Sequence, residues 1–341
     1  MELNKKSKGV LKALAKRKIK NHLLADLLLQ SKKISLKQHL RIESCCDHVA
    51  HIKEHNRDKK MDLLYAWTCG HRLCPVCSKS KTSKLIKTHE KLLIEINKQY
   101  PNQYKFLFLT LTIRNCKGHE LKDQIKAMTN GFNKMTRYKA INNILSGYIR
   151  RVEVTYNDKE DTYHPHIHVL LMVKTSYKPS DSSYIEQKTW IDYWAKAMKL
   201  DYSPNVDIRL VRNKKSDLDD YTNKKDYITK RTIKKSLLED NIAKQTNKML
   251  IPGLAAVQEI SKYSVKPVKI QKGLTDNQKS MIYGFLHEAL KGVRVVTYGG
   301  LMKQLLIEIS EEEQAEFDKI NLANDTSKQL EYDLIRSEYI P

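Results

Sequence analysis

The run Tyr163-His-Pro-His-Ile-His-Val-Leu-Leu-Met-Val173 decides how the middle of this chain folds. It is short, apolar and rich in aliphatic residues, which predicts a buried β-strand. Side chains alternate between the two faces of a strand, so His166 and His168 share one face and Ile167 lies on the other. Burying two imidazoles at the head of an apolar strand is costly unless something binds them, so the pair is a candidate metal site.

A third ligand can be located from the register of a hairpin. Residues 150–156 form a second strand candidate, and the turn-rich residues 157–161 connect it to the first. A hairpin centred between positions 159 and 160 places Glu153 opposite His166. We therefore expect Glu153, His166 and His168 to converge and to hold Mg²⁺ or Mn²⁺, which can bind a phosphate oxygen. The alternative is that they are ordinary polar residues at a strand end.

The composition indicates a polyanionic partner. The chain has 341 residues, a formal net charge of +23 and a sequence pI near 9.5. Such an excess of lysine and arginine favours nucleic acid, because these side chains release counterions when they neutralise phosphates. Residues 1–100 hold 23 basic and 9 acidic residues, whereas 308–341 hold 3 basic and 10 acidic ones. We therefore expect the tail to face a protein partner or solvent rather than DNA.

No membrane segment or secretion signal is expected. The longest apolar runs fall short of the roughly 18 to 20 residues that a membrane span requires. The lysine-rich start lacks the apolar segment and cleavage site of a signal peptide. Six cysteines in a chain of this length do not suggest a disulfide scaffold, so we expect a cytoplasmic protein with no membrane partner.

Hydrophobic periodicity divides the chain into helices and strands. The expected elements are a basic helical region over 1–40, a helix over 83–99, a strand over 104–113, helices over 121–138 and 183–200, a strand over 206–211, and a helix from Gly253 to Lys266. The expected domains are a basic N-terminal region with a zinc knuckle (1–100), a catalytic domain (101–275), and a C-terminal extension with an acidic, helical tail (276–341).

A cysteine cluster precedes the predicted sheet. Cys69, Cys74 and Cys77 include a Cys-Pro-x-Cys turn, which lets two thiolates bind one ion. We expect structural Zn²⁺ bound by these three and by either Cys45 or Cys46, and the sequence leaves that choice open. His48 and His71 are alternative ligands. Free buried thiols and a redox-active Cys-x-x-Cys pair are the other interpretations.

A candidate nucleophile lies in the segment Gln258-Glu-Ile-Ser-Lys-Tyr-Ser-Val-Lys266. Tyr263 is four residues after Glu259, so a helix places both on one face, with Lys266 one turn further and Lys262 beside it. Ammonium groups help a phenol to ionise near a phosphate, and Glu259 can act as a general base. Attack on phosphorus would give a phosphotyrosine. Tyr221 and Tyr227 have similar basic neighbours and are alternative candidates, as is a solvated helix face without chemistry.

The order of three motifs resembles a known family. The motifs are Phe108-Leu-Thr-Leu-Thr112, His164-Pro-His-Ile-His168 and Glu259-Ile-Ser-Lys-Tyr263. Together with the cysteine knuckle and the run from Gly292 to Gly300, they look like the rolling-circle replication initiators of small Gram-positive plasmids, in the HUH endonuclease superfamily. The resemblance covers roughly residues 41–300.

The resemblance implies an α+β fold with a central antiparallel sheet, helices on one side and the two histidines on a central strand. To this fold are added an N-terminal zinc-binding segment and a C-terminal helical region. It implies that Tyr263 cuts one strand of plasmid origin DNA to leave a 5′-phosphotyrosine and a free 3′-OH, and that Glu259 activates water at termination. Thr110 and Thr112 would support the metal site.

The implied partners are origin DNA, double-stranded for recognition and single-stranded at the nick, together with host helicase and polymerase. An oligomer is compatible with the resemblance. Two alternative functions stay open, which are a transposase or relaxase with the same chemistry, and a zinc-dependent nucleic-acid-binding protein without catalysis. A relaxase would usually carry a third histidine and an N-terminal tyrosine, which are not evident here.

Overall fold

The structure, a computed structural model, describes residues 5–53, 61–212, 251–262, 273–320, 327–333 and 338–340. The fold is α+β, as expected. The chain divides into two compact units, each made of separate stretches of sequence. The first comprises Met1–Lys81, Val265–Val293 and Gln314–Pro341, and the second comprises Thr82–Ser264 and Arg294–Glu313. The three consecutive domains expected from the sequence stay a prediction.

A five-stranded antiparallel sheet forms the centre of the second unit. In spatial order its strands are β6 (Val206–Leu210), β3 (Tyr104–Thr112), β5 (Thr162–Lys174), β4 (Leu145–Asn157) and β7 (Val296–Gly300). The run that opens the sequence argument is β5, and it takes the middle position. Nearly every residue of β5 from Pro165 to Val173 is buried, so both faces of this strand need cover.

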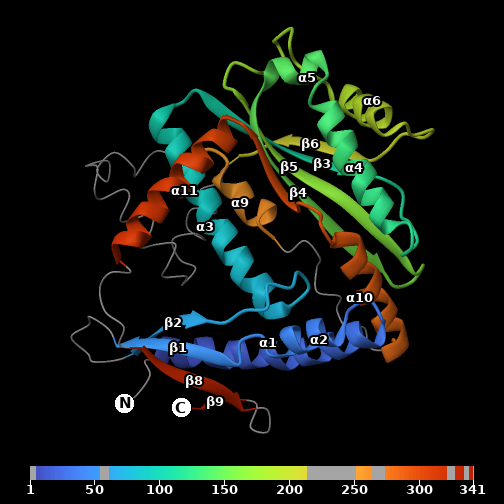
Figure 1. Ribbon diagram of the computed structural model, residues 1–341. Coiled ribbons are helices and arrows are strands. Elements are labelled where there is room, and N and C mark those ends of the chain that lie inside the picture. Colours follow the sequence, from blue (N-terminus) through green and yellow to red (C-terminus); the bar gives the residue numbers. More distant parts are fainter. Residues whose placement is uncertain are drawn as a thin grey trace. The chain divides into compact units, whose positions relative to one another are not determined.

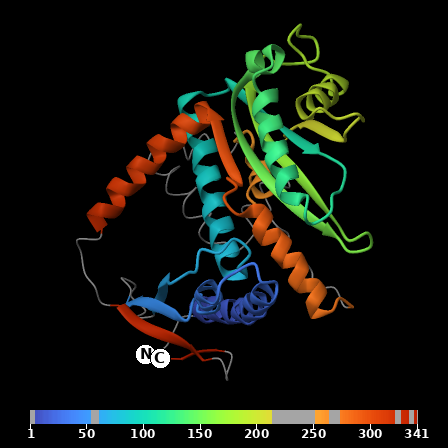
Figure 2. The same cartoon turned by 45° about the vertical axis from the view of Figure 1, so that its right-hand side comes forward.

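Helices cover both faces of this sheet. Figures 1 and 2 show α4 (Leu121–Met135) and α6 (Gln187–Met198) on one face, and α3 (Pro75–Gln99), α9 (Leu254–Ile260) and α11 (Leu301–Ile320) on the other. A short helix, α5 (Lys139–Ile144), leads into β4. The expectation of helices on one side only is wrong, because the central strand is apolar on both of its faces.

The face toward α3, α9 and α11 carries an apolar core of the second unit. From the strands this core takes Phe106, Phe108, Ile149, Leu170 and Met172. The same face continues along β5 into His168 and His166, because alternate residues of a strand share a face. The candidate metal ligands therefore lie where an apolar core gives way to polar side chains.

The helix that leads to the candidate tyrosine is shorter than expected. Gly253 precedes α9 with φ of +83°, and a Cβ there would lie 2.8 Å from the Phe106 ring, so this position requires glycine. The expected helix to Lys266 is wrong for its described part, since α9 ends at Ile260. Ser261 is the C-cap residue, and its N–H still bonds to the Val257 carbonyl at 3.0 Å.

The first unit combines helices with a four-stranded sheet. Its helices are α1 (Lys5–Gln30), α2 (Leu36–Glu43) and α10 (Asp276–Leu290), and its strands, in spatial order, are β2 (Met61–Ala66), β1 (His48–Lys53), β8 (Ser327–Asp333) and β9 (Glu338–Ile340). Capping boxes at Ser35 and Thr275 start α2 and α10, because each side chain accepts a bond from a backbone N–H that the helix leaves unpaired.

The acidic, helical tail expected from the sequence is present only as far as Ile320, the last residue of α11. After α11, the described residues form β8 and β9, and β8 pairs with β1 from the other end of the sequence. A strand partner almost 280 residues away leaves no local signal, which is why the sequence did not predict it. Within the described parts of the chain, no helix has the length and apolar character needed to cross a lipid bilayer.

Candidate functional site

The hairpin register places Glu153 opposite His166, as predicted. Strands β4 and β5 pair with Glu153 facing His166 and Arg151 facing His168. Glu153 Oε2 lies 3.5 Å from His166 Nε2 and 3.3 Å from His168 Nε2. All three side chains are buried, and Glu153 is only 1% exposed.

The three ligand atoms have the separations that a divalent ion requires. They lie within 4.8 Å of one another. In an octahedral Mg²⁺ site with bonds near 2.1 Å, neighbouring ligand atoms are about 3.0 Å apart. The distances from the carboxylate oxygen to the imidazole nitrogens exceed this by only a few tenths of an ångström. Two imidazoles and one carboxylate would leave open positions for phosphate or water. The group is therefore compatible with metal binding.

Hydrogen bonds behind the imidazoles orient them toward Glu153. His168 Nδ1 lies 3.1 Å from Thr110 Oγ1, and His166 Nδ1 lies 3.2 Å from the His164 carbonyl oxygen. When Nδ1 donates in each case, Nε2 keeps its lone pair for a metal ion, the arrangement usual for histidine ligands. Thr112, also expected to support this group, instead donates to the Asn205 carbonyl at 2.8 Å.

The residues expected to act as nucleophile and base are only partly within the described chain. Tyr263 and Lys266 lie outside the described residues, as do Tyr221 and Tyr227. Glu259 is described, is partly exposed, and forms an ion pair with Lys262. The structure thus brings Glu153, His166 and His168 together and leaves the tyrosine untested.

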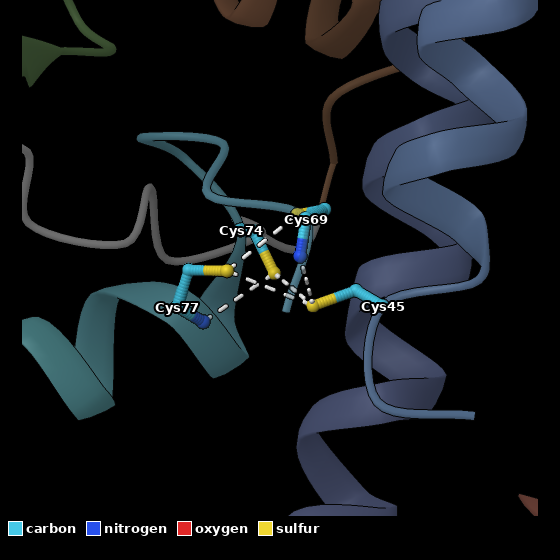
Figure 3. Close-up of side chains that lie close together, drawn as sticks. All are labelled: Cys45, Cys69, Cys74 and Cys77. Carbon is cyan, nitrogen blue, oxygen red and sulfur yellow. Dashed lines mark hydrogen bonds between the residues drawn. The ribbon is translucent and has the colours of Figure 1, made fainter. Parts of the chain in front are cut away.

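Four cysteine sulfurs in the first unit gather around one point (Figure 3). Cys45 follows α2, Cys69 and Cys74 lie in the segment before α3, and Cys77 lies in the first turn of α3. The Sγ atoms of Cys77 and Cys69 are 3.5 Å apart, while those of Cys45 lie 3.6 Å from both Cys77 and Cys74. A tetrahedral zinc site with Zn–S bonds near 2.3 Å has sulfurs about 3.8 Å apart. The cluster therefore fits a zinc ion.

Hydrogen bonds from the other three thiols lower the pKa of the Cys77 thiol. Hydrogen bonds to Cys45, Cys69 and Cys77 raise the pKa of Cys74, because a proton must stay on a sulfur that donates. A zinc ion would replace these protons, since it binds thiolates.

Cys45 rather than Cys46 joins this cluster. Cys46 adopts a left-handed backbone conformation with φ of +64°, and its N–H bonds to the Trp67 carbonyl at 2.8 Å. The four sulfurs within reach of one another are those of Cys45, Cys69, Cys74 and Cys77. The alternative ligands His71 and His48 are not members of this group. The His71 ring lies 3.0 Å from that of His287, and His48 is the first residue of β1.

A buried polar network that was not predicted from the sequence lies beside the candidate metal ligands. His89 of α3 contacts Ser261 and Tyr298, and Arg151 of β4 lies close by. Two arginines inside an otherwise apolar strand were a visible signal for Arg151. His89 sits in an ordinary amphipathic helix and gave none.

Fold and site together define an α+β protein with one group suited to a divalent ion and a second suited to zinc. Comparison with known proteins then supplies the family. A family model described as "Replication protein" matches residues 60–339. This chain belongs to that family, and the resemblance to replication initiators expected from the ordered motifs is confirmed.

Relatives support the same assignment. "Protein rep" of Bacillus amyloliquefaciens is 37% identical over 274 residues, which cover 79% of this chain and 72% of the relative. "Protein rep" of Streptococcus pneumoniae serotype 2 (strain D39 / NCTC 7466) is 32% identical over 306 residues, covering 89% and 81%. A "Replication protein" of Staphylococcus aureus is 34% identical over 239 residues, covering 69% and 86%. No solved structure matches the chain.

Proposed function

We propose that this protein initiates rolling-circle replication of a plasmid by nicking one strand of the origin DNA, with Tyr263 as the nucleophile. The observation that carries the proposal is the convergence of Glu153, His166 and His168 on the central strands of an antiparallel sheet. Membership of the replication protein family supports the proposal, because a replication initiator must bind origin DNA. The net charge of +23 suits such a polyanionic partner.

Glu153, His166 and His168 would hold Mg²⁺ or Mn²⁺. The bound ion would polarise the scissile phosphate and balance charge that develops on its oxygens. The Tyr263 phenolate would form an O–P bond while the bond from phosphorus to the 3′ oxygen breaks. The 3′ oxygen takes a proton and becomes the primer end, and the 5′ phosphate stays on the tyrosine. Strand transfer reverses this exchange, so the phosphodiester energy is kept.

Glu259 would serve as general base for the water that hydrolyses the phosphotyrosine at termination. Its ion pair with Lys262 would open first, so that the carboxylate oxygen is free to accept a proton from the water. Zn²⁺ on Cys45, Cys69, Cys74 and Cys77 would stabilise the first unit. Host helicase and polymerase would act on the nicked origin in the cytoplasm.

The test is formation of a covalent adduct. The full chain is incubated with Mn²⁺ and a single-stranded oligonucleotide carrying the plasmid origin, and SDS-stable protein–DNA species are resolved on a gel. We expect an adduct from the wild type and none from Tyr263→Phe or His166→Ala. Tyr221→Phe and Tyr227→Phe are matched controls that should keep it. DNA binding without any adduct from the wild type would instead favour a non-catalytic binding protein.

A further inference from the structure

A buried histidine outside the metal group links three elements of the second unit. His89 Nδ1 lies 2.7 Å from Ser261 Oγ, and His89 Nε2 lies 2.8 Å from the Tyr298 hydroxyl. His89 and Ser261 have no exposed surface. The imidazole therefore connects α3 both to the residue that follows α9 and to β7. We call His89, Ser261, Tyr298 and Arg151 the His89 network.

The central imidazole of this network is neutral. Burial lowers the pKa of His89 to about 3, and the nearby charge of Arg151 acts in the same direction. A neutral imidazole has one N–H donor and one acceptor nitrogen. Both of its partners are hydroxyls, which can rotate to donate or accept. Each tautomer can therefore satisfy both bonds, and the connection needs no protonation change.

Arg151 connects strand β4 of the sheet to the C-terminal end of α9. Its Nη1 donates to the Ile260 carbonyl at 3.4 Å, at the last residue of α9. The pKa of Arg151 falls to about 10 because of burial, while the charges of Glu153, Tyr298 and Glu259 oppose that fall. At 2% exposure the guanidinium does not reach solvent, so it is not a DNA contact. Its role is internal.

The His89 network contacts α9 at its C-terminal end. Ser261 is the first residue after α9, and Tyr263 follows two residues later. Two residues of chain reach at most about 7 Å, so fixing Ser261 limits the distance at which Tyr263 can lie from it. A displacement of about 1 Å at a reacting group can cost on the order of 100-fold in rate.

We propose that His89 is a positioning residue, which fixes the end of α9 through Ser261 and so sets where the nucleophile begins relative to Glu153, His166 and His168. The inference rests on the proposed function of Tyr263. Arg151 on β4 bonds to the Ile260 carbonyl, and Tyr298 on β7 bonds to His89, so both help to fix this position. Loss of the His89 network should lower the rate of attack by Tyr263 and leave the binding of DNA and metal ion unchanged.

The experiment measures adduct formation by the full chain in a single turnover, with Mn²⁺ and saturating single-stranded origin oligonucleotide. In Ser261→Ala the bond to His89 is lost and no bulk is added. We expect the rate constant to fall about 10- to 100-fold while the Kd values for Mn²⁺ and the oligonucleotide stay within about 2-fold. Tyr298→Phe keeps the bond between His89 and Ser261 and should lose less.

Ser280→Ala is the matched control. Ser280 is also buried, and its hydroxyl donates to the Leu27 carbonyl at 2.9 Å within the first unit. This variant should react at the wild-type rate, because it removes a comparable hydrogen bond away from the network. Equal slowing in Ser280→Ala and Ser261→Ala would assign the effect to general destabilisation and overturn the proposal.

The outcomes separate this inference from the proposed function. If the wild type forms an adduct and Ser261→Ala forms it equally fast, the positioning role is wrong and the nicking function stands. If Ser261→Ala also loses Mn²⁺ binding or its cooperative unfolding transition, the network is merely structural. If the wild type forms no adduct, both proposals fail together.

Discussion

Replacing His89 with glutamine should change how stability depends on pH. The pKa of His89 is about 3 in the folded chain, against an ordinary 6.5, because burial disfavours the imidazolium. As pH falls below 6.5, the unfolded chain takes up a proton at this position and the folded chain does not. The stability that neutral His89 contributes is therefore complete above about pH 6.5 and is lost as pH falls toward 3. Glutamine cannot take up this proton.

The size of the effect follows from the pKa difference. A pH of 5 lies 1.5 units below the ordinary imidazole pKa of 6.5, which applies in the unfolded chain. Each unit corresponds to about 1.4 kcal/mol in the free energy of unfolding. The wild type should therefore lose about 2 kcal/mol between pH 7 and pH 5 through this residue alone. His89→Gln should be less stable at pH 7, and the gap to the wild type should narrow by that amount at pH 5.

Tryptophan fluorescence during urea unfolding can measure this gap. Trp190 and Trp194 are buried in the second unit, which contains His89, whereas Trp67 of the first unit is 47% exposed. The fluorescence change therefore reports mainly on the second unit. Other titrating groups contribute equally to both proteins and cancel in the difference. A gap that stays constant from pH 7 to pH 5 would show that the folded chain accepts a proton at His89, and the reasoning would fail.

Three further substitutions test particular contacts. Cys45→Ser should lower bound zinc from about one per chain to near zero after dialysis, while Cys46→Ser keeps it, as measured with a colorimetric chelator. Thr110→Val removes the hydroxyl behind one imidazole and should weaken Mn²⁺ binding about 10- to 100-fold by calorimetric titration, with Thr110→Ser as a near-normal control. Gly253→Ala places a methyl group against an aromatic ring of β3 in a backbone conformation that disfavours it, and should cost about 1 to 3 kcal/mol in urea unfolding. Wild-type stability there would refute the packing argument.

The hairpin register could be predicted because its information is local. A short turn between two neighbouring strands fixes which residues face each other, and Glu153 and His166 lie only 13 positions apart. A slip by one residue would have turned Glu153 to the opposite face of the sheet. The central strands β3 and β5 were predictable for a similar reason, since their composition alone marks them as buried.

The choice between Cys45 and Cys46 could not be made from composition. Both are buried cysteines at adjacent positions. What separates them is the left-handed backbone at Cys46 and its bond to Trp67. Such a conformation depends on the β-structure that follows, and a non-glycine residue gives no sequence signal for it.

Long-range contacts account for the rest of what the sequence did not reveal. His89 meets Ser261 and Tyr298 across 172 and 209 residues of sequence. No periodicity or spacing rule links positions so far apart.

The compact spacing of the β4–β5 hairpin has a consequence for how the protein is made. Glu153 and His168 lie 15 positions apart, whereas Tyr263 follows His168 by 95 positions. A hairpin closes within roughly 1 to 10 μs, while a ribosome adding about 5 to 20 residues per second needs some 5 to 20 s for that interval. The candidate metal ligands can thus come together on the nascent polypeptide well before the proposed nucleophile, Tyr263, is synthesised. If Tyr263 cuts DNA as proposed, translation itself would delay that activity until most of the chain exists.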